Sequence, residues 1–135
     1  MANDMQTAGR GRTIGWVLSG LMIAFLMIDA TMKLLALPNV LEAQAPLGFT
    51  GAATARGLGV LLLACTLLYA APQTAALGAI LLTGYLGGAV ATHLRVGDPL
   101  FSHVLFGVYM GVLLWLGLYL RDARLRALVP LRRAM

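Results

Sequence analysis

Five ionisable side chains lie within otherwise apolar stretches of this sequence: Asp29, Lys33, Arg56, His93 and His103. Hydrocarbon rejects such groups, so an ionisable residue in an apolar segment is a candidate functional residue. Carboxylate and imidazole groups exchange protons, whereas ammonium and guanidinium groups attract oxyanions. Together these residue types suggest a proton-handling or oxyanion-binding site, provided that the fold brings them close to one another.

The elements that must position these side chains are four apolar segments, each long enough to cross a bilayer as a helix. Sixty per cent of the 135 residues are hydrophobic and only 11% are charged, which is too few to cover a water-facing surface. The sequence therefore predicts an all-α, integral membrane four-helix transmembrane bundle that forms a single domain. The expected helices are about 14–37, 55–71, 73–94 and 101–120.

Basic residues predict the orientation of these helices. Two arginines precede the first segment and five follow the last, so seven of the ten Lys and Arg residues flank this end of the bundle. The positive-inside rule then places both termini in the cytoplasm, with tails 1–13 and 121–135. Topology accounts for these arginines, so the lipid bilayer is the expected partner and no nucleic acid is expected. The aromatic residues expected to form an interfacial belt at this end are Trp16, Tyr69, Trp115 and Tyr119.

The helical rise places the five ionisable side chains in one layer near the opposite end of the bundle. Measured from the cytoplasmic helix ends, Asp29 and Arg56 lie at about 22 Å, His103 at about 26 Å, and Lys33 and His93 at about 28 Å. Asp29 is too short to reach the interface and needs a cationic partner, either Lys33 at i+4 or Arg56 on the next helix. We expect the interhelical Asp29–Arg56 pair, with Lys33 nearby.

The third segment borders this layer with further polar groups. Tyr85, Gly88 and Thr92 fall on roughly one helical face that could line a cleft, and Arg95 follows at the end of the segment. Two interpretations stay open. The layer forms a pocket for a ligand or for protons, or its charges only fix the register of the helices, as a buried polar pair can.

Small residues at a spacing of four predict close helix packing. Gly84 and Gly88 form one such pair, and Gly107 and Gly111 form another. The segment 38–53 that follows the first helix is either a lid over the layer or a plain loop.

Redox and metal chemistry carried by this chain alone finds little support in its sequence. Cys65 is the only cysteine, which excludes dithiol exchange within the chain. His93 and His103 could jointly ligate a haem or a metal, but two histidines without a supporting cluster argue against either. No metal site, self-contained catalytic motif or certain cofactor is predicted.

Two stretches carry a family resemblance. Leu77–Asp122 resembles the second half of the DoxX-like membrane proteins, and "MKLLALP" (Met32–Pro38) is similar to the Lys-Leu feature of that family's first helix. The resemblance covers about 14–130. It implies a four-helix, multi-pass protein of the bacterial inner membrane. Many members carry a glutamate just after an early glycine of the second helix, whereas Gly59–Leu62 is apolar here.

The family takes its name from a small subunit linked to thiosulfate:quinone oxidoreduction. The resemblance therefore implies a redox-associated accessory subunit that binds a quinone headgroup or a similar amphipathic ligand in the outer polar layer. The candidate ligand-binding residues are Asp29, Lys33, Arg56, Tyr85, Thr92, His93, Arg95 and His103. The alternative is a non-catalytic structural or partner-binding membrane protein whose charges only fix helix packing. A membrane or redox partner subunit and a homo-oligomer are both compatible with the sequence.

Overall fold

The computed structural model describes residues 1–128, and these residues form helices and turns without any strand. Four helical spans within them are long and apolar enough to cross a membrane: α1, α3, α4 and the stretch from η2 through α5. The predicted all-α membrane fold is confirmed. The elements in chain order are α1 (Ala2–Leu34), α2 (Pro38–Gln44), η1 (Ala45–Leu47), α3 (Ala52–Ala70), α4 (Ala75–Arg95), η2 (Leu100–Val104), α5 (Phe106–Arg121) and α6 (Ala123–Leu128).

Prolines and glycines set the limits of the spans. Pro38 starts α2 at its first helical position, where the missing N–H costs nothing. Pro72 lies in the short turn between α3 and α4. Gly97 has a φ of 76° in the turn after α4, a backbone conformation that side-chain-bearing residues rarely adopt. Pro99 then leads into the π-helical turn η2.

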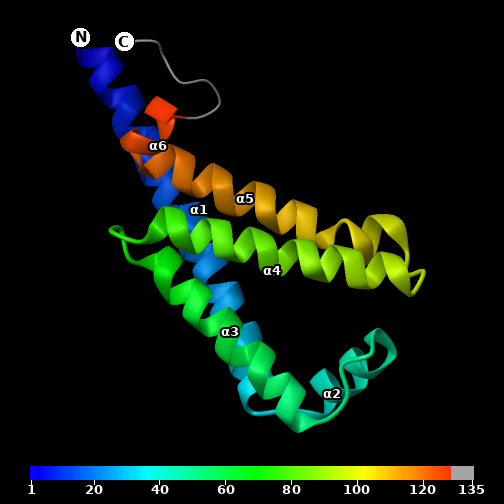
Figure 1. Ribbon diagram of the computed structural model, residues 1–135. Coiled ribbons are helices and arrows are strands. Elements are labelled where there is room, and N and C mark those ends of the chain that lie inside the picture. Colours follow the sequence, from blue (N-terminus) through cyan, green and yellow to red (C-terminus); the bar gives the residue numbers. More distant parts are fainter. Residues whose placement is uncertain (129–135) are drawn as a thin grey trace.

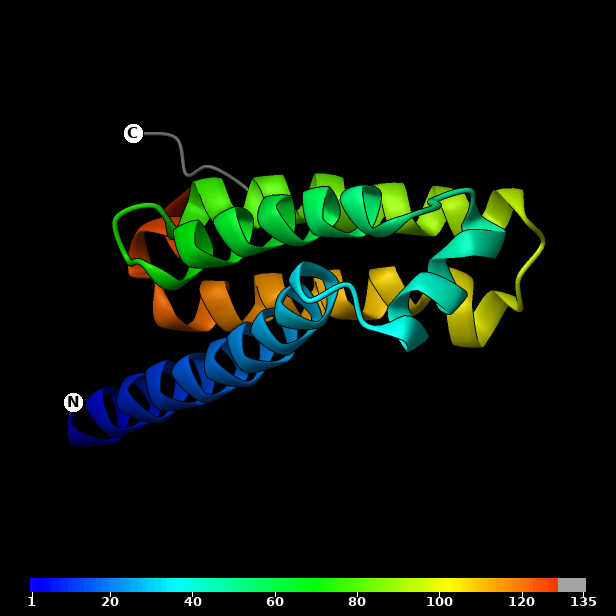
Figure 2. The same cartoon turned by 90° about the horizontal axis from the view of Figure 1, so that it is seen from below.

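The spans form two antiparallel pairs that cross one another (Figure 1). One pair is α1 with α3, the other is α4 with α5, and α1 also packs along α5 while α3 packs along α4. The two pairs diverge toward the end of the molecule that carries α2, and α2 lies near the opening between them (Figures 1 and 2). We call this end the α2 end. The other end, which carries the arginines Arg10, Arg12, Arg121, Arg124 and Arg126, is the basic end.

The first helix is longer than the sequence predicts. It begins at Ala2 rather than near residue 14, so the predicted tail 1–13 is a helical extension that projects from the body (Figure 1). Hydropathy does not detect this extension because most of its residues are polar or glycine. It contains no proline, and Asp4 in the first turn complements the helix dipole. In the predicted tail 121–135, α6 occupies Ala123–Leu128, and residues 129–135 lie outside the described part of the chain.

Tyr69 is buried at the centre of the basic end. Its side chain is fully enclosed, and its hydroxyl donates to the Leu114 carbonyl at 2.6 Å and lies 3.1 Å from Ser19 Oγ. These contacts tie α3 to α5 and α1. The expectation that Tyr69 belongs to an interfacial aromatic belt is therefore wrong, because its ring faces the other helices rather than the headgroups.

Gly78 and Gly15 make the closest helix contacts. A Cβ on Gly78 would meet the Tyr69 backbone nitrogen at 2.2 Å, and one on Gly15 would meet the Arg121 nitrogen at 2.6 Å. Of the predicted packing pairs, Gly107 lies against α4, where its Cβ would be 2.9 Å from the Leu86 carbonyl oxygen. A Cβ on Gly84 or on Gly88 would meet no other group within 4 Å, so the predicted role of these two glycines in close packing is wrong.

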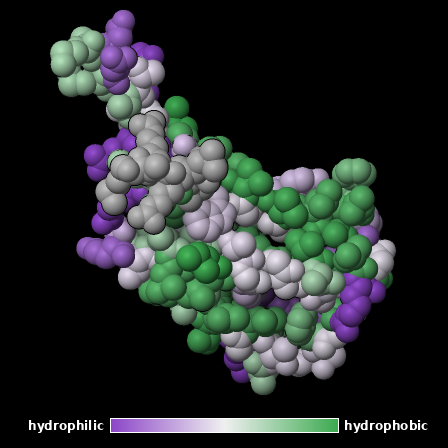
Figure 3. Space-filling model, turned by 45° about the horizontal axis from the view of Figure 1, so that its top comes forward, coloured by the Kyte–Doolittle hydropathy of each residue, from purple (hydrophilic) through white to green (hydrophobic). Residues whose placement is uncertain are grey.

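Apolar side chains make up much of the face of the bundle that Figure 3 shows. Exposed examples occur on every span and include Leu21, Val60, Ile80 and Val112, each more than half exposed. In the same view, hydrophilic groups gather at the projecting N-terminal helix at the upper left and along the right edge (Figure 3). An apolar band between two polar ends is the surface expected of a bundle that sits in a bilayer.

Candidate ligand-binding pocket

A pocket of about 470 Å³ lies at the α2 end, where the two helix pairs diverge. All four spans and the α2–η1 segment contribute to its wall, so the pocket is a feature of the whole fold. Its volume falls in the range of small-molecule sites. The residues that line it include Phe25, Asp29, Lys33, Gln44, Tyr85, Gly88, Thr92, His93, His103, Phe106 and Met110.

Six of the eight candidate residues from the sequence line this pocket. The face of α4 inferred to border a cleft does so through Tyr85, Gly88 and Thr92. Gly88 leaves room at the wall, since a Cβ there would meet nothing within 4 Å. The six candidates are Asp29, Lys33, Tyr85, Thr92, His93 and His103.

The acidic and basic groups of the pocket form an ion pair within α1. Lys33 Nζ donates to Asp29 Oδ1, one helical turn earlier, and the two side chains are 12% and 35% exposed, respectively. The expected interhelical Asp29–Arg56 pair is therefore wrong. Asp29 pairs with Lys33 rather than with Arg56 because Lys33 lies on the same face of the same helix, so the pair forms without any adjustment between helices.

Arg56 and Arg95 lie outside the pocket wall. Arg56 is exposed on α3, and its Nε donates to the carbonyl of Leu34 at the end of α1. Arg95 ends α4, and its Nη2 donates to the Leu47 carbonyl at 2.8 Å. Each arginine thus holds one chain segment to another at the α2 end.

The two histidines form a pair in the pocket wall. Their ring centroids are 5.9 Å apart, with the rings inclined at 62°. His93 Nδ1 bonds to Asp98 Oδ2, and His103 Nδ1 bonds to Ser102 Oγ at 2.8 Å. Both Nδ1 atoms take part in these hydrogen bonds. The other ring nitrogen of each histidine, Nε2, is therefore the one that can contact a ligand or exchange a proton.

Gln44 is a pocket residue that the sequence did not reveal. It ends α2, its residue is 8% exposed, and its Oε1 has no hydrogen-bond partner within residues 1–128. A buried polar atom without a partner is costly, and a ligand or a water molecule usually satisfies it. No sequence signal singles out Gln44, because only the folding of 38–47 against the spans brings it to the pocket.

The segment after α1 covers the pocket rather than forming a plain loop. It folds into α2 and η1 and supplies Ala43, Gln44, Leu47 and Phe49 to the wall. The bond from Arg95 to the Leu47 carbonyl joins the segment to the end of α4. Of the two interpretations of 38–53, the structure therefore favours a cover.

The remaining wall is apolar and aromatic. Phe25 of α1 and Phe106 of α5 have ring centroids 6.1 Å apart, a distance typical of interacting aromatic pairs. Met110 lies on the same side, and its flexible side chain adapts to irregular shapes. The wall therefore combines an ion pair, two histidines and an amide with apolar side chains, which suits a ligand with a polar head and an apolar body.

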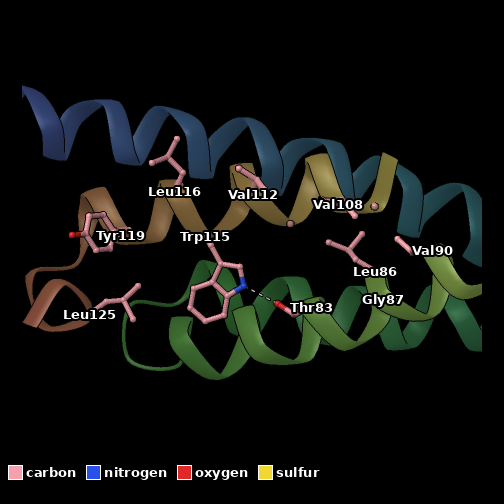
Figure 4. A pocket seen from close by; sticks show the side chains of 12 residues that line it. Thr83, Leu86, Gly87, Val90, Val108, Val112, Trp115, Leu116, Tyr119 and Leu125 are labelled. Carbon is pink, nitrogen blue, oxygen red and sulfur yellow. Dashed lines mark hydrogen bonds between the residues drawn. The ribbon is translucent and has the colours of Figure 1, made fainter. Parts of the chain in front are cut away.

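A second, larger cavity of about 610 Å³ is a groove between α4 and α5 (Figure 4). Its wall is almost entirely apolar. Trp115 crosses the groove and donates from Nε1 to Thr83 Oγ1 at 2.7 Å (Figure 4). The groove contains no ionisable side chain except the phenol of Tyr119, so it lacks the chemistry of the pocket at the α2 end.

Among the described residues, no group of three or more His, Cys, Asp and Glu side chains is arranged to hold a metal ion. Cys65 is buried on α3 and takes no part in the pocket. The arrangement can therefore offer charge, hydrogen bonds and proton exchange to a bound molecule through the side chains already described.

Comparison with known proteins identifies a family. The sequence profile described as the DoxX-like family matches residues 17–117, which is more than half of the chain and includes every span in whole or in part. No curated protein and no solved structure gives a significant match.

Proposed function

Because this chain belongs to the DoxX-like family of membrane proteins, we propose that it acts as a redox-associated accessory subunit that binds a quinone-like molecule in the pocket at the α2 end. In this proposal the protein is a multi-pass protein of the bacterial inner membrane, with the basic end in the cytoplasm and the pocket on the outer side. The orientation rests on the distribution of arginines.

The observation that carries the proposal is the unpartnered Gln44 Oε1 beside the Asp29–Lys33 pair and the two histidines. A quinol hydroxyl would donate to the amide oxygen, and a quinone carbonyl would accept from Lys33 or a histidine Nε2. The apolar ring and tail would lie against Phe25 and Phe106. The polar groups of the pocket thus suit both the oxidised and the reduced headgroup.

In the proposed role, side chains of the pocket accept the protons that a bound quinol releases. Oxidation of a quinol releases two protons and two electrons, so a quinol site needs groups that accept the protons. Asp29 and the Nε2 atoms of His93 and His103 are suitable acceptors, and Asp98 steadies the His93 ring. The electrons would pass to a redox centre on a partner subunit, which the proposal requires.

Filling the pocket tests this proposal. We expect Gly88→Leu to weaken binding of a decyl-substituted benzoquinone at least about tenfold, because the new side chain enters a space that is open in the wild type. Isothermal titration calorimetry on the full chain in mild detergent measures the affinity. The fold should survive, since leucine is a better helix former than glycine and meets no neighbour at its Cβ.

Gly87→Leu is the matched control. Gly87 is the adjacent residue on α4, its Cβ would also meet nothing within 4 Å, and it lines the groove between α4 and α5 instead of the pocket. Equal affinities of wild type, Gly87→Leu and Gly88→Leu, or no binding by any of them, would reject quinone binding in this pocket.

The structural alternative also rests on a specific observation. Several polar groups at the α2 end have partners within the protein: Lys33 bonds to Asp29, His93 to Asp98 and Arg95 to the Leu47 carbonyl. If these bonds serve only to join helices, their replacement will change stability and nothing else. Paired apolar replacement of Asp29 and Lys33 separates the two roles, because stability and ligand binding then respond differently.

A further inference from the structure

A third cavity, of about 350 Å³, lies at the basic end, far from the pocket just described. The beginning of the apolar part of α1, the turn between α3 and α4, and the junction of α5 with α6 enclose it. Three arginines from two regions of the chain line it together with one tryptophan and one acid: Arg12, Trp16, Arg121, Asp122 and Arg124.

Arg121 is the fixed element of this cavity. The residue is only 8% exposed, and its Nη2 donates to the Tyr69 carbonyl at 2.8 Å. The guanidinium carbon lies 4.5 Å from the centre of the Trp16 ring and 4.9 Å from that of Tyr69, so both aromatic faces hold the cation in place. Its position is thus set before any ligand arrives.

The same guanidinium retains unused donor capacity. Its Nε is buried and has no hydrogen-bond partner among residues 1–128, and a guanidinium offers five N–H donors in a fixed fork. A buried cation with an unsatisfied donor, lining a cavity, calls for an anionic acceptor. The fork geometry matches the oxygens of a phosphate or carboxylate.

The surrounding charges favour an anion. Arg12 and Arg124 add two cations that are exposed at the rim. Asp122 accepts from the Arg124 backbone nitrogen at 2.9 Å and lies 3.5 Å from its Nε, which offsets one of them. Three cations and one carboxylate leave a net charge of +2, so the cavity attracts an anion while Asp122 orients Arg124.

The position of the cavity identifies the source of the anion. It lies at the ends of the membrane spans, beside Trp16, a residue type that prefers the headgroup level of a bilayer. At the same level of α1, Ile14 and Val17 are 53% and 56% exposed, so the helix offers apolar surface to acyl chains at the depth of the cavity. We propose that this cavity binds the phosphate of an anionic phospholipid and thereby anchors α1 to the α5–α6 junction.

Native mass spectrometry of the full chain in neutral detergent tests the proposal. Titration with phosphatidylglycerol should give a saturable lipid adduct, and phosphatidylcholine with the same acyl chains should bind at least about fivefold more weakly. Arg12→Gln should weaken phosphatidylglycerol binding about fivefold, the change expected for the loss of one basic residue at a lipid surface. Inorganic phosphate that competes with phosphatidylglycerol would identify the phosphate as the recognised group.

Arg10→Gln is the matched control, since it removes the same charge from the same helix at a position that does not line the cavity. Both variants change exposed residues, so their thermal unfolding should match that of the wild type. Equal weakening by Arg10→Gln and Arg12→Gln would show a diffuse charge effect and overturn the site. Binding of inorganic phosphate without preference for phosphatidylglycerol over phosphatidylcholine would overturn the assignment to a lipid.

Discussion

Asp29→Ala is expected to destabilise the folded protein by about 3 kcal/mol, because it leaves the Lys33 ammonium without its counterion. The Lys33 side chain is 12% exposed and its bonded carboxylate comes from the same helix. Lys33→Ala is expected to destabilise the protein less, because the remaining Asp29 carboxylate is 35% exposed and can be solvated from the pocket. Unfolding by denaturant in mixed micelles, followed by circular dichroism, measures both effects.

The double variant Asp29→Leu, Lys33→Met distinguishes a binding role from a structural one. Replacing both members of a buried ion pair by apolar residues is often neutral for stability, so most of the loss should be recovered. If the pair contacts a ligand, the double variant should regain stability but still bind quinone more weakly than the wild type. Recovery of both stability and binding would support the structural alternative and contradict the proposed role of Asp29 and Lys33.

Gly78→Ala is expected to cost at least about 3 kcal/mol or to prevent folding. Its Cβ would lie 2.2 Å from the Tyr69 nitrogen and 2.5 Å from the Tyr69 Cα, and backbone atoms cannot rotate away as a flexible side chain can. Separating α3 from α4 there would also disturb the bond from the Tyr69 hydroxyl to Leu114. Expression level and thermal unfolding in detergent report the effect.

Gly84→Ala on the same helix controls for helix propensity. A Cβ at Gly84 would meet nothing within 4 Å, so alanine should be neutral or stabilise the protein by about 0.5–1 kcal/mol. If both alanine variants unfold at the same temperature as the wild type, the close contact between α3 and α4 does not determine the fold.

Hydropathy is sufficient to predict the membrane fold, because the length and apolarity of a span are properties of the local sequence. The helical rise is sufficient to predict that Asp29, Lys33, His93 and His103 share one level, since depth along a helix depends only on residue number. Which side chain pairs with which depends on the angles between helices. These angles cannot be inferred from the spacing of residues in the sequence, and the expected Asp29–Arg56 pair is wrong for that reason.

Helix crossings also decide which glycines pack. Gly84 and Gly88 have the spacing of a packing motif, but their face of α4 borders the pocket left by the diverging helix pairs. Gly78 and Gly15 make the tightest contacts. Gly78 has no glycine four residues away, and Gly15 has one in Gly11, whose own Cβ would meet nothing within 4 Å. Gln44 escapes prediction because it lies beyond the end of a span, in a segment whose position depends on tertiary contacts.

The measurement that tests the central claim most directly is a comparison of the small molecules that co-purify with wild type and with Gly88→Leu. These two proteins and the control Gly87→Leu are extracted from the same bacterial membranes in mild detergent, and their organic extracts are analysed by absorption and mass spectrometry. A quinone-like molecule is expected at about one equivalent with the wild type, retained by Gly87→Leu and depleted in Gly88→Leu, because only the last variant fills the pocket. Identical extracts that contain only bulk phospholipid would contradict quinone binding in the pocket at the α2 end.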